Sequence, residues 1–138
     1  MRRFVMMTHG KMAEGLRQSL TLFLGEEHPF AAVSCYLDDT PAADQIAAWF
    51  STLAPEDEAV VLTDIVGGSV CQLVMPYLSR PQTFVLGGFN FPMLLQLACL
   101  PEAALNDETL HQLVESCRPS MAYVNEFNAA SAARSDDE

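Results

Sequence analysis

Four short runs of apolar residues alternate along the chain with longer stretches in which apolar positions recur every three or four residues. A continuous apolar run indicates a strand that is covered on both faces, and the longer period indicates a helix with one buried face. The runs cover residues 4–7, 30–37, 59–62 and 83–86. Strand and helix therefore alternate four times, which predicts an α/β fold with a parallel sheet.

Turn and cap residues indicate where the helices begin and end. Gly25 is expected to stop a first helix over residues 11–24, and Thr40 with Pro41 to cap the second helix. The remaining helices are expected over residues 70–78, 90–100 and 106–117. Residues 120–127 alternate weakly and are compatible with a final short strand. The sequence thus predicts one domain over residues 1–127 and a flexible acidic tail over residues 128–138.

Composition excludes several classes of function. The chain has 138 residues, half of them apolar, which suffices for one ordinary core. Its net charge of −11, from 18 acidic and 7 basic residues, argues against binding to nucleic acid or to an anionic membrane. No apolar stretch has the length of a signal peptide or a membrane span, so we expect a cytoplasmic protein. The four cysteines form no CxxC pair and are expected to be free thiols.

Two ends of predicted strands carry residues suited to nucleophilic chemistry. His9 follows the first strand, in a tight turn before the first helix, and Asp64 follows the third. The first and third strands of such sheets are often neighbours, and ligands bind beyond the carboxyl ends of the strands. A carboxylate that accepts the hydrogen bond of one imidazole nitrogen leaves the other nitrogen as a nucleophile, and it stabilises the cation that forms.

A glycine pair and a serine follow Asp64 at the start of a predicted helix. The backbone N–H groups of Gly67 and Gly68 and the hydroxyl of Ser69 are candidates to hold an anion near His9. Phosphoryl transfer requires mainly positioning and charge stabilisation, so this set favours it. Each signal also has a structural interpretation: a histidine after a strand, an aspartate before glycines and a GGS loop all occur as ordinary turns and caps.

Three motifs together resemble the mannose-family enzyme IIA domain of the bacterial phosphoenolpyruvate-dependent sugar phosphotransferase system. They are Thr8-His9-Gly10, then Asp64 with Gly67-Gly68-Ser69, then Gly88, Asn90, Pro92, Met93 and Leu94. They occur in the order and spacing of that family, and the similarity extends to about Phe127. The resemblance implies a four-stranded parallel sheet with helices on both faces. It also implies a C-terminal antiparallel strand, exchanged between the subunits of a homodimer, for which residues 120–127 are the candidate.

The resemblance also implies a function. His9 would take a phosphoryl group from the histidine-containing phosphocarrier protein and pass it to enzyme IIB, which serves the membrane components IIC and IID. Asp64 would orient His9, and Gly67, Gly68 and Ser69 would lie beside the phosphoryl group. No metal or other cofactor would be required. Mannose, fructose, sorbose and an amino sugar all remain candidates for the transported sugar.

The sequence departs from the family pattern beside this site. Where the family usually has a Pro-Phe-Asn-like triplet after GGS, this chain has Val70-Cys71-Gln72, and Lys11 follows His9-Gly10 where an apolar residue is common. We interpret Lys11 as solvated. The altered triplet leaves open a regulatory homologue that binds a partner without sustained transfer.

Other classes fit less well. A receiver-type signalling domain would need an acidic pair after the first strand and a lysine after the fifth, but the chain has no lysine beyond Lys11. A zinc site of His9, Asp64 and Cys35 or Cys71 lacks the short ligand pairs of such sites. The related phosphoryl donor of dihydroxyacetone kinase shares the fold but fits the second and third motifs less well. His28 and His111 lie in no motif and are expected to be surface residues.

Overall fold

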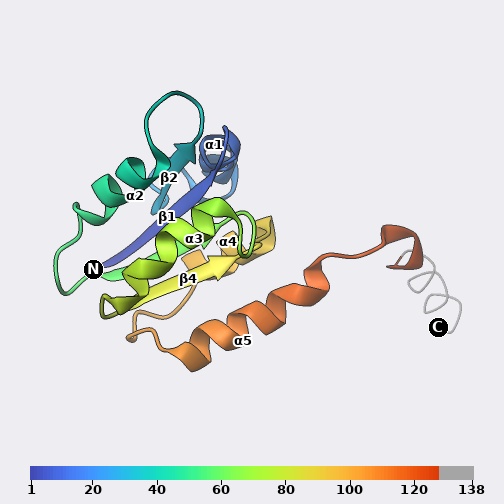
Figure 1. Ribbon diagram of the computed structural model, residues 1–138. Coiled ribbons are helices and arrows are strands. Elements are labelled where there is room, and N and C mark those ends of the chain that lie inside the picture. The colour runs from blue at the N-terminus through green and yellow to red at the C-terminus, as the bar shows by residue number, and fades with distance from the viewer. Residues whose placement is uncertain (128–138) are drawn as a thin grey trace, which may run out of the picture.

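The structure is a computed structural model that describes residues 1–127, and it confirms a parallel sheet with helices on both faces (Figure 1). The strands are β1 (Arg2–His9), β2 (Phe30–Cys35), β3 (Glu58–Thr63) and β4 (Thr83–Gly87). The α-helices are α1 (Met12–Leu24), α2 (Ala42–Phe50), α3 (Ser69–Val74), α4 (Phe91–Ala98) and α5 (Asp107–Cys117). Two 3-10 helices follow α3 and α5, namely η1 (Met75–Ser79) and η2 (Arg118–Ser120).

The strand order places the two predicted site strands side by side. The sheet has the order β2-β1-β3-β4, so β1 lies between β2 and β3. In the register, Met7 of β1 is paired with Val33 of β2 and Thr63 of β3. Parallel strands end at the same edge, and the residues that follow β1, β2 and β3 therefore meet there.

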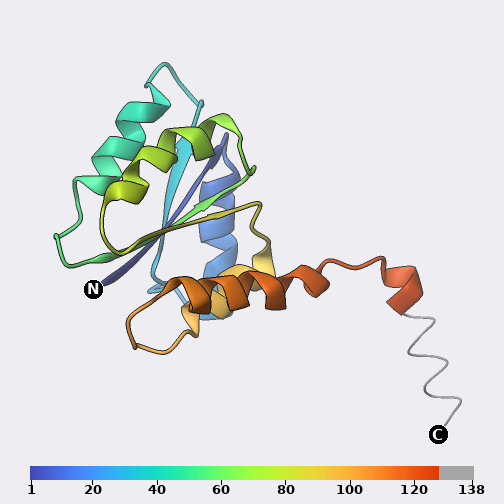
Figure 2. The ribbon, with the colours of Figure 1, turned by 60° about the horizontal axis from the view of Figure 1, so that its bottom comes forward.

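Alternation along β1 distributes its side chains between two cores, because successive residues of a strand point to opposite faces. Phe4 and Met6 belong to the core under α1, α4 and α5, whereas Val5 and Met7 belong to the core under α2 and α3. All four side chains are buried. Figure 2 shows α2 and α3 together on one side of the sheet and α5 on the other. This burial on both faces explains why the strands read as continuous apolar runs.

Two helix boundaries differ from the prediction. The helix expected over residues 70–78 is divided into α3 and the 3-10 helix η1, because Pro76 has no N–H to continue the α-helical pattern. The second helix begins at Ala42 with Pro41 outside it, and Thr40 does not cap it. The Thr40 N–H instead donates to Asp38 Oδ1 at 2.8 Å.

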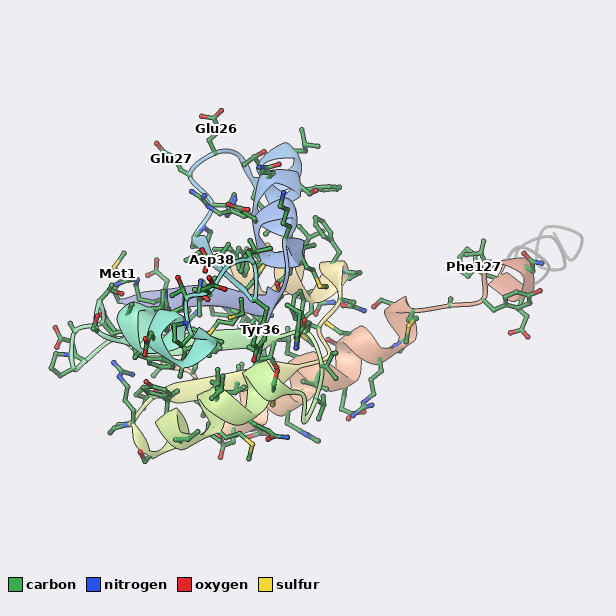
Figure 3. The ribbon with its side chains drawn as sticks, turned by 45° about the horizontal axis from the view of Figure 1, so that its top comes forward. Met1, Glu26, Glu27, Tyr36, Asp38 and Phe127 are labelled. Carbon is green, nitrogen blue, oxygen red and sulfur yellow. The ribbon has the colours of Figure 1, made fainter. Side chains whose placement is uncertain are left out.

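Residues 118–127, which follow α5, form no strand in this chain. Residues 118–120 are η2, and residues 124–127 form one helical turn on an arm that extends away from the sheet (Figures 1 and 3). The arm exposes large apolar side chains, including Met121 (84%) and Phe127 (63%). The fifth strand, its exchange and the homodimer therefore stay predictions about an assembly. The tail predicted over residues 128–138 lies outside the described residues. Within residues 1–127, no helix has both the length and the hydrophobicity to cross a membrane.

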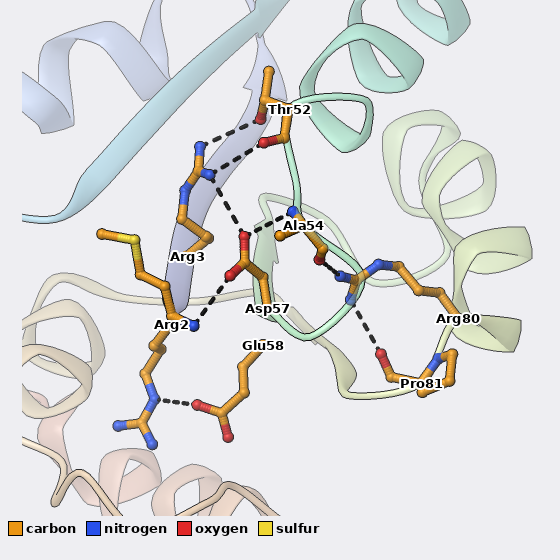
Figure 4. Close-up of polar contacts among 9 residues, drawn as sticks. Arg2, Arg3, Thr52, Ala54, Asp57, Glu58, Arg80 and Pro81 are labelled. Carbon is orange, nitrogen blue, oxygen red and sulfur yellow. Dashed lines mark hydrogen bonds and ion pairs between the residues drawn. The ribbon is translucent and has the colours of Figure 1, made fainter.

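Polar contacts gather at the opposite edge of the sheet, near the start of β1 (Figure 4). The buried Asp57 accepts a hydrogen bond from the Ala54 N–H at 2.9 Å and pairs with the amino group of Met1 at 3.0 Å. Beside it, Glu58 pairs with Arg2 Nε at 2.9 Å. These contacts join the N-terminus to the loop before β3, so they fix the start of β1.

Asp57 is expected to make the stability of the fold depend on acid pH. The Ala54 N–H, and then the amino terminus and Arg3, hold the pKa of Asp57 below its usual 3.8. A carboxylate of this kind stabilises the fold above the unfolded-state pKa, and the contribution is lost as pH falls through the folded-state pKa. We expect Asp57→Asn to lower the free energy of unfolding at pH 7. The difference from the parent chain should shrink in urea titrations towards pH 3.

The exposed Asp39, in the loop before α2, offers a matched control. Asp39→Asn should leave the free energy of unfolding nearly unchanged at both pH values. If Asp57→Asn costs the same at pH 3 as at pH 7, the paired carboxylate is not the source of the effect.

Candidate functional site

The turn after β1 fixes the position of His9. Thr8 is buried, and its hydroxyl accepts a hydrogen bond from the Ala13 N–H at 2.8 Å, which anchors the first turn of α1. Gly10 adopts a positive φ of 61°, and its N–H donates to the Cys35 carbonyl at 2.7 Å. Glycine suits this turn because a β-carbon disfavours that conformation. The His9 side chain thus lies at the sheet edge and is 40% exposed.

Asp64 holds His9 by two hydrogen bonds. One carboxylate oxygen, Oδ2, accepts from the His9 backbone N–H at 2.9 Å and lies 2.9 Å from the imidazole Nδ1. Burial of the Asp64 side chain, which is 10% exposed, opposes ionisation, but the hydrogen bonds from His9 outweigh it and lower the pKa of Asp64 below its usual value. The carboxylate is therefore ionised at neutral pH, and it selects the tautomer of His9 with hydrogen on Nδ1. The Nε2 lone pair of the neutral ring then faces away from Asp64.

Ser69 lies at that second nitrogen. Its Oγ is 3.1 Å from His9 Nε2, and Ser69 is the first residue of α3. Gly67 before it has a positive φ of 75°. The N–H of Gly68 already donates to the Ile65 carbonyl at 3.1 Å. In this conformation the Ser69 hydroxyl, rather than the Gly68 N–H, is the donor of this turn in contact with Nε2.

The triplet that departs from the family pattern has structural roles. Val70 is fully buried in the core under α2 and α3, and Cys71 is half-buried. The Gln72 side-chain amide donates to the Gly67 carbonyl at 2.8 Å. Gln72 therefore braces the turn that positions Ser69, so one member of the altered triplet supports the site directly.

The third motif shapes the neighbouring loop. Asn90 Oδ1 accepts from the Met93 N–H at 3.0 Å and caps α4, while its amide donates to Ser120 Oγ at 2.8 Å. A β-carbon at Gly87 would lie 2.8 Å from Val66 Cγ2. Gly87, directly before the motif, therefore lets the loop between Asp64 and Ser69 pack closely on the end of β4. Among residues 1–127, no residue of the motif makes a hydrogen bond to His9.

Among the described residues, Lys11, His28 and His111 make no hydrogen bond or ion pair with His9. Lys11 is exposed and makes no side-chain cap for α1. His28 fixes its loop, with Nε2 at 2.9 Å from the Arg17 carbonyl and Nδ1 accepting from the Phe30 N–H at 3.2 Å. His111 is exposed on α5.

Tyr36 also belongs to the site, although the sequence pattern places it inside the strand predicted over residues 30–37. The structure ends β2 at Cys35, and Tyr36 follows on the loop at the same sheet edge (Figure 3). Its ring stacks on the imidazole of His9, with ring centroids 5.1 Å apart and an interplanar angle of 25°. Its hydroxyl donates to Ser69 Oγ at 2.9 Å. Because β2 neighbours β1, the residue that follows β2 lies at the same edge of the sheet as His9 and Asp64.

The donor set does not resemble a zinc site. Burial, followed by the charge of Asp64, raises the pKa of the Cys35 thiol, so the thiol stays protonated and is a poor ligand. Within residues 1–127, no three His, Cys, Asp or Glu side chains gather in a group that could hold a metal ion.

Comparisons with known proteins identify the family and the fold. The sequence profile of the family described as "PTS system fructose IIA component" matches residues 3–115. A Klebsiella pneumoniae protein, described as a permease of the phosphoenolpyruvate-dependent sugar phosphotransferase system (PTS), is similar in structure. Its TM-score is 0.84 at 27% identity, over 91% of this chain and 93% of that one. A mannose/sorbose-specific IIA subunit from Enterococcus faecalis gives 0.77 at 27% identity, over 88% and 92%.

A third structure supports the fold alone. The PTS IIA protein associated with the fucose utilization operon of Streptococcus pneumoniae has a TM-score of 0.72 at 23% identity, and the match covers 91% of this chain and 94% of that one. A search of curated proteins finds no match to the sequence.

Proposed function

Because the chain belongs to the family of PTS system fructose IIA components and is thus a component of a sugar phosphotransferase system, we propose that it carries a phosphoryl group on His9. The donor would be the histidine-containing phosphocarrier protein, and the acceptor would be enzyme IIB, which supplies the membrane components IIC and IID for sugar uptake. The observation that carries the proposal is the arrangement of His9, with Nδ1 held by Asp64 and Nε2 at the exposed side of the ring.

The proposed chemistry is an exchange between two imidazoles. The Nε2 lone pair of neutral His9 attacks the phosphorus of a donor phosphohistidine whose other ring nitrogen carries a proton. The bond between phosphorus and the donor nitrogen breaks, its electron pair stays on that nitrogen, and the donor leaves as a neutral imidazole. Positive charge develops on the His9 ring, and the Asp64 carboxylate at 2.9 Å from Nδ1 stabilises it. Attack by an enzyme IIB nucleophile reverses the step. The hydroxyl of Ser69 and the turn at Gly67 and Gly68 lie next to the position that the phosphoryl group would take.

The active form is proposed to be a homodimer of the domain over residues 1–127, in the cytoplasm. The exposed apolar side chains on the arm after α5 support a second copy as their partner, because solvated clusters of this kind usually mark interfaces. They are Met121, Tyr123, Val124 and Phe127. Light scattering at micromolar concentration is expected to give the mass of two chains, and a monomeric mass would count against the dimer.

A chase experiment tests the proposed route. The protein is first incubated with phosphoenolpyruvate, enzyme I and the phosphocarrier protein, and enzyme IIB is then added. We expect one phosphoryl group to appear on this chain and then to move to enzyme IIB, with no movement when this chain is omitted. A chain that binds the phosphocarrier protein but passes nothing to any enzyme IIB would instead be the regulatory homologue that the altered residues 70–72 suggest.

A further inference from the structure

Two contacts of Tyr36 and one of Ser69 meet at the imidazole of His9. Its ring stacks on the imidazole, its hydroxyl donates to Ser69 Oγ, and Ser69 Oγ lies 3.1 Å from His9 Nε2. We infer that Tyr36 is a positioning residue for phosphoryl transfer. Its ring fixes the plane of the imidazole, and its hydroxyl turns the Ser69 hydroxyl towards Nε2. The inference rests on the proposed function of His9 and adds a residue to its site.

The hydrogen bonds can run in one direction only. Asp64 is ionised and accepts from Nδ1–H, so Nε2 of the neutral ring has a lone pair and must accept. Ser69 has a single hydroxyl hydrogen, which it therefore gives to Nε2, and its oxygen accepts from Tyr36. The chain runs from Tyr36 through Ser69 and His9 to Asp64, and bonds aligned in this way polarise one another. Without the Tyr36 hydroxyl, the Ser69 hydroxyl loses the partner that orients it.

The backbone of Tyr36 argues against a purely structural role. Its φ is 65°, a left-handed conformation that a residue with a β-carbon rarely adopts and that persists only where the surroundings hold it. The residue is 49% exposed, so burial in the core does not offset the free-energy cost of this conformation. The contacts with His9 and Ser69 are the specific interactions that the conformation makes possible.

The same contacts suit both states of the carrier. For attack on phosphorus, the Ser69 hydroxyl hydrogen must leave the Nε2 lone pair. The hydroxyl then lies close enough to donate to a phosphoryl oxygen once the Nε2–P bond has formed. Tyr36 can keep its hydrogen bond to Ser69 Oγ throughout, because that bond uses a lone pair of the serine oxygen and leaves the hydroxyl hydrogen free to donate. Tyr36 is therefore expected to affect both the free and the phosphorylated site.

A double-mutant cycle tests the coupling between the two hydroxyl groups. Tyr36→Phe keeps the ring and removes the hydroxyl, and we expect it to slow phosphoryl uptake from the phosphocarrier protein by about fivefold, the effect of one lost hydrogen bond. Ser69→Ala should slow uptake at least as much, and adding Tyr36→Phe to it should change nothing further. Tyr36→Leu, which also removes the ring, should be slower than Tyr36→Phe. Tyr77→Phe, a hydroxyl deletion in η1, is the matched control and should retain the parent rate.

Nitrogen-15 NMR of the unphosphorylated protein separates this inference from the proposed function. The Nε2 resonance of His9, assigned with His9→Ala, should move towards that of an acceptor nitrogen without a hydrogen bond in Tyr36→Phe, and should not move when the same change is made in Ser69→Ala. If the parent protein takes no phosphoryl group, the proposed function fails, and the NMR comparison still decides the role of Tyr36. The inference is overturned if Tyr36→Phe leaves the Nε2 resonance unchanged, or if it slows Ser69→Ala as much as it slows the parent protein.

Discussion

His9→Ala is expected to abolish phosphoryl uptake and onward transfer, because it removes the nitrogen that would bond to phosphorus. The fold should persist. The His9 side chain is 40% exposed, and its backbone N–H would still donate to Asp64. We expect a change of less than about 1 kcal/mol in the free energy of unfolding, which is typical of exposed positions. Phosphoryl chase assays and urea titrations of the same preparation measure the two effects.

His111→Ala is the matched control, because His111 is exposed on α5 and lies in no motif. This variant should transfer at the parent rate. A His9→Ala chain that still passes phosphoryl groups to enzyme IIB would place the carrier residue elsewhere and would remove the basis of the proposal.

Asp64→Ala is expected to slow phosphoryl uptake by about 100-fold or more. This is the lower end of the rate contribution that a general acid–base side chain makes. The change removes the acceptor of both His9 hydrogen bonds, so the tautomer and the plane of the ring are no longer selected. It also removes the negative charge that stabilises the positively charged ring. Single-turnover rates at saturating phosphocarrier protein measure this loss directly.

Asp64→Asn divides the two contributions of Asp64. The amide oxygen can still accept from His9, but the charge is lost, so we expect a rate between those of the parent protein and Asp64→Ala. Asp39→Asn, in the loop before α2, removes an exposed charge that makes no hydrogen bond or ion pair to His9 or Ser69, and it should have no effect. A full-speed Asp64→Ala variant would refute the role assigned to the carboxylate.

The sheet and the first pair of site residues were predictable because both depend on local patterns. Strands covered on both faces must be apolar throughout, and the ends of parallel strands must meet at one edge. His9 and Asp64 are therefore predicted to lie close together if β1 and β3 are neighbours, as they are in the structure. The contact with Ser69 followed because the turn after Asp64 leads directly into α3.

Tyr36 was not predictable in the same way. An aromatic residue after a run of apolar residues resembles one more strand position, and its positive φ leaves no sequence signal in a residue other than glycine. Phe23 shows the converse limit. Its spacing from Leu16 and Leu20 puts it on the apolar face of α1, yet it is 63% exposed and packs edge-on against Phe91. Periodicity indicates a face of a helix but not how far the neighbouring elements extend over it.

The C-terminal segment depends on a partner for its secondary structure. Residues 120–127 carry alternating apolar side chains, but a strand forms only where another strand offers its N–H and C=O groups. In this chain the segment lies away from the sheet, with Tyr123 and Val124 exposed. Pairing of this segment with a strand of a second copy requires a dimer, and the mass in solution tests for that dimer.

The intact mass of the protein after incubation with phosphoenolpyruvate, enzyme I and the phosphocarrier protein tests the central claim most directly. We expect the parent chain to gain one phosphoryl group that is lost on brief acid treatment, as a phosphohistidine is, and His9→Ala to gain none. An unchanged parent mass, in a donor mixture that phosphorylates another IIA protein of the family, would contradict the account. So would a phosphoryl group that His9→Ala acquires equally well.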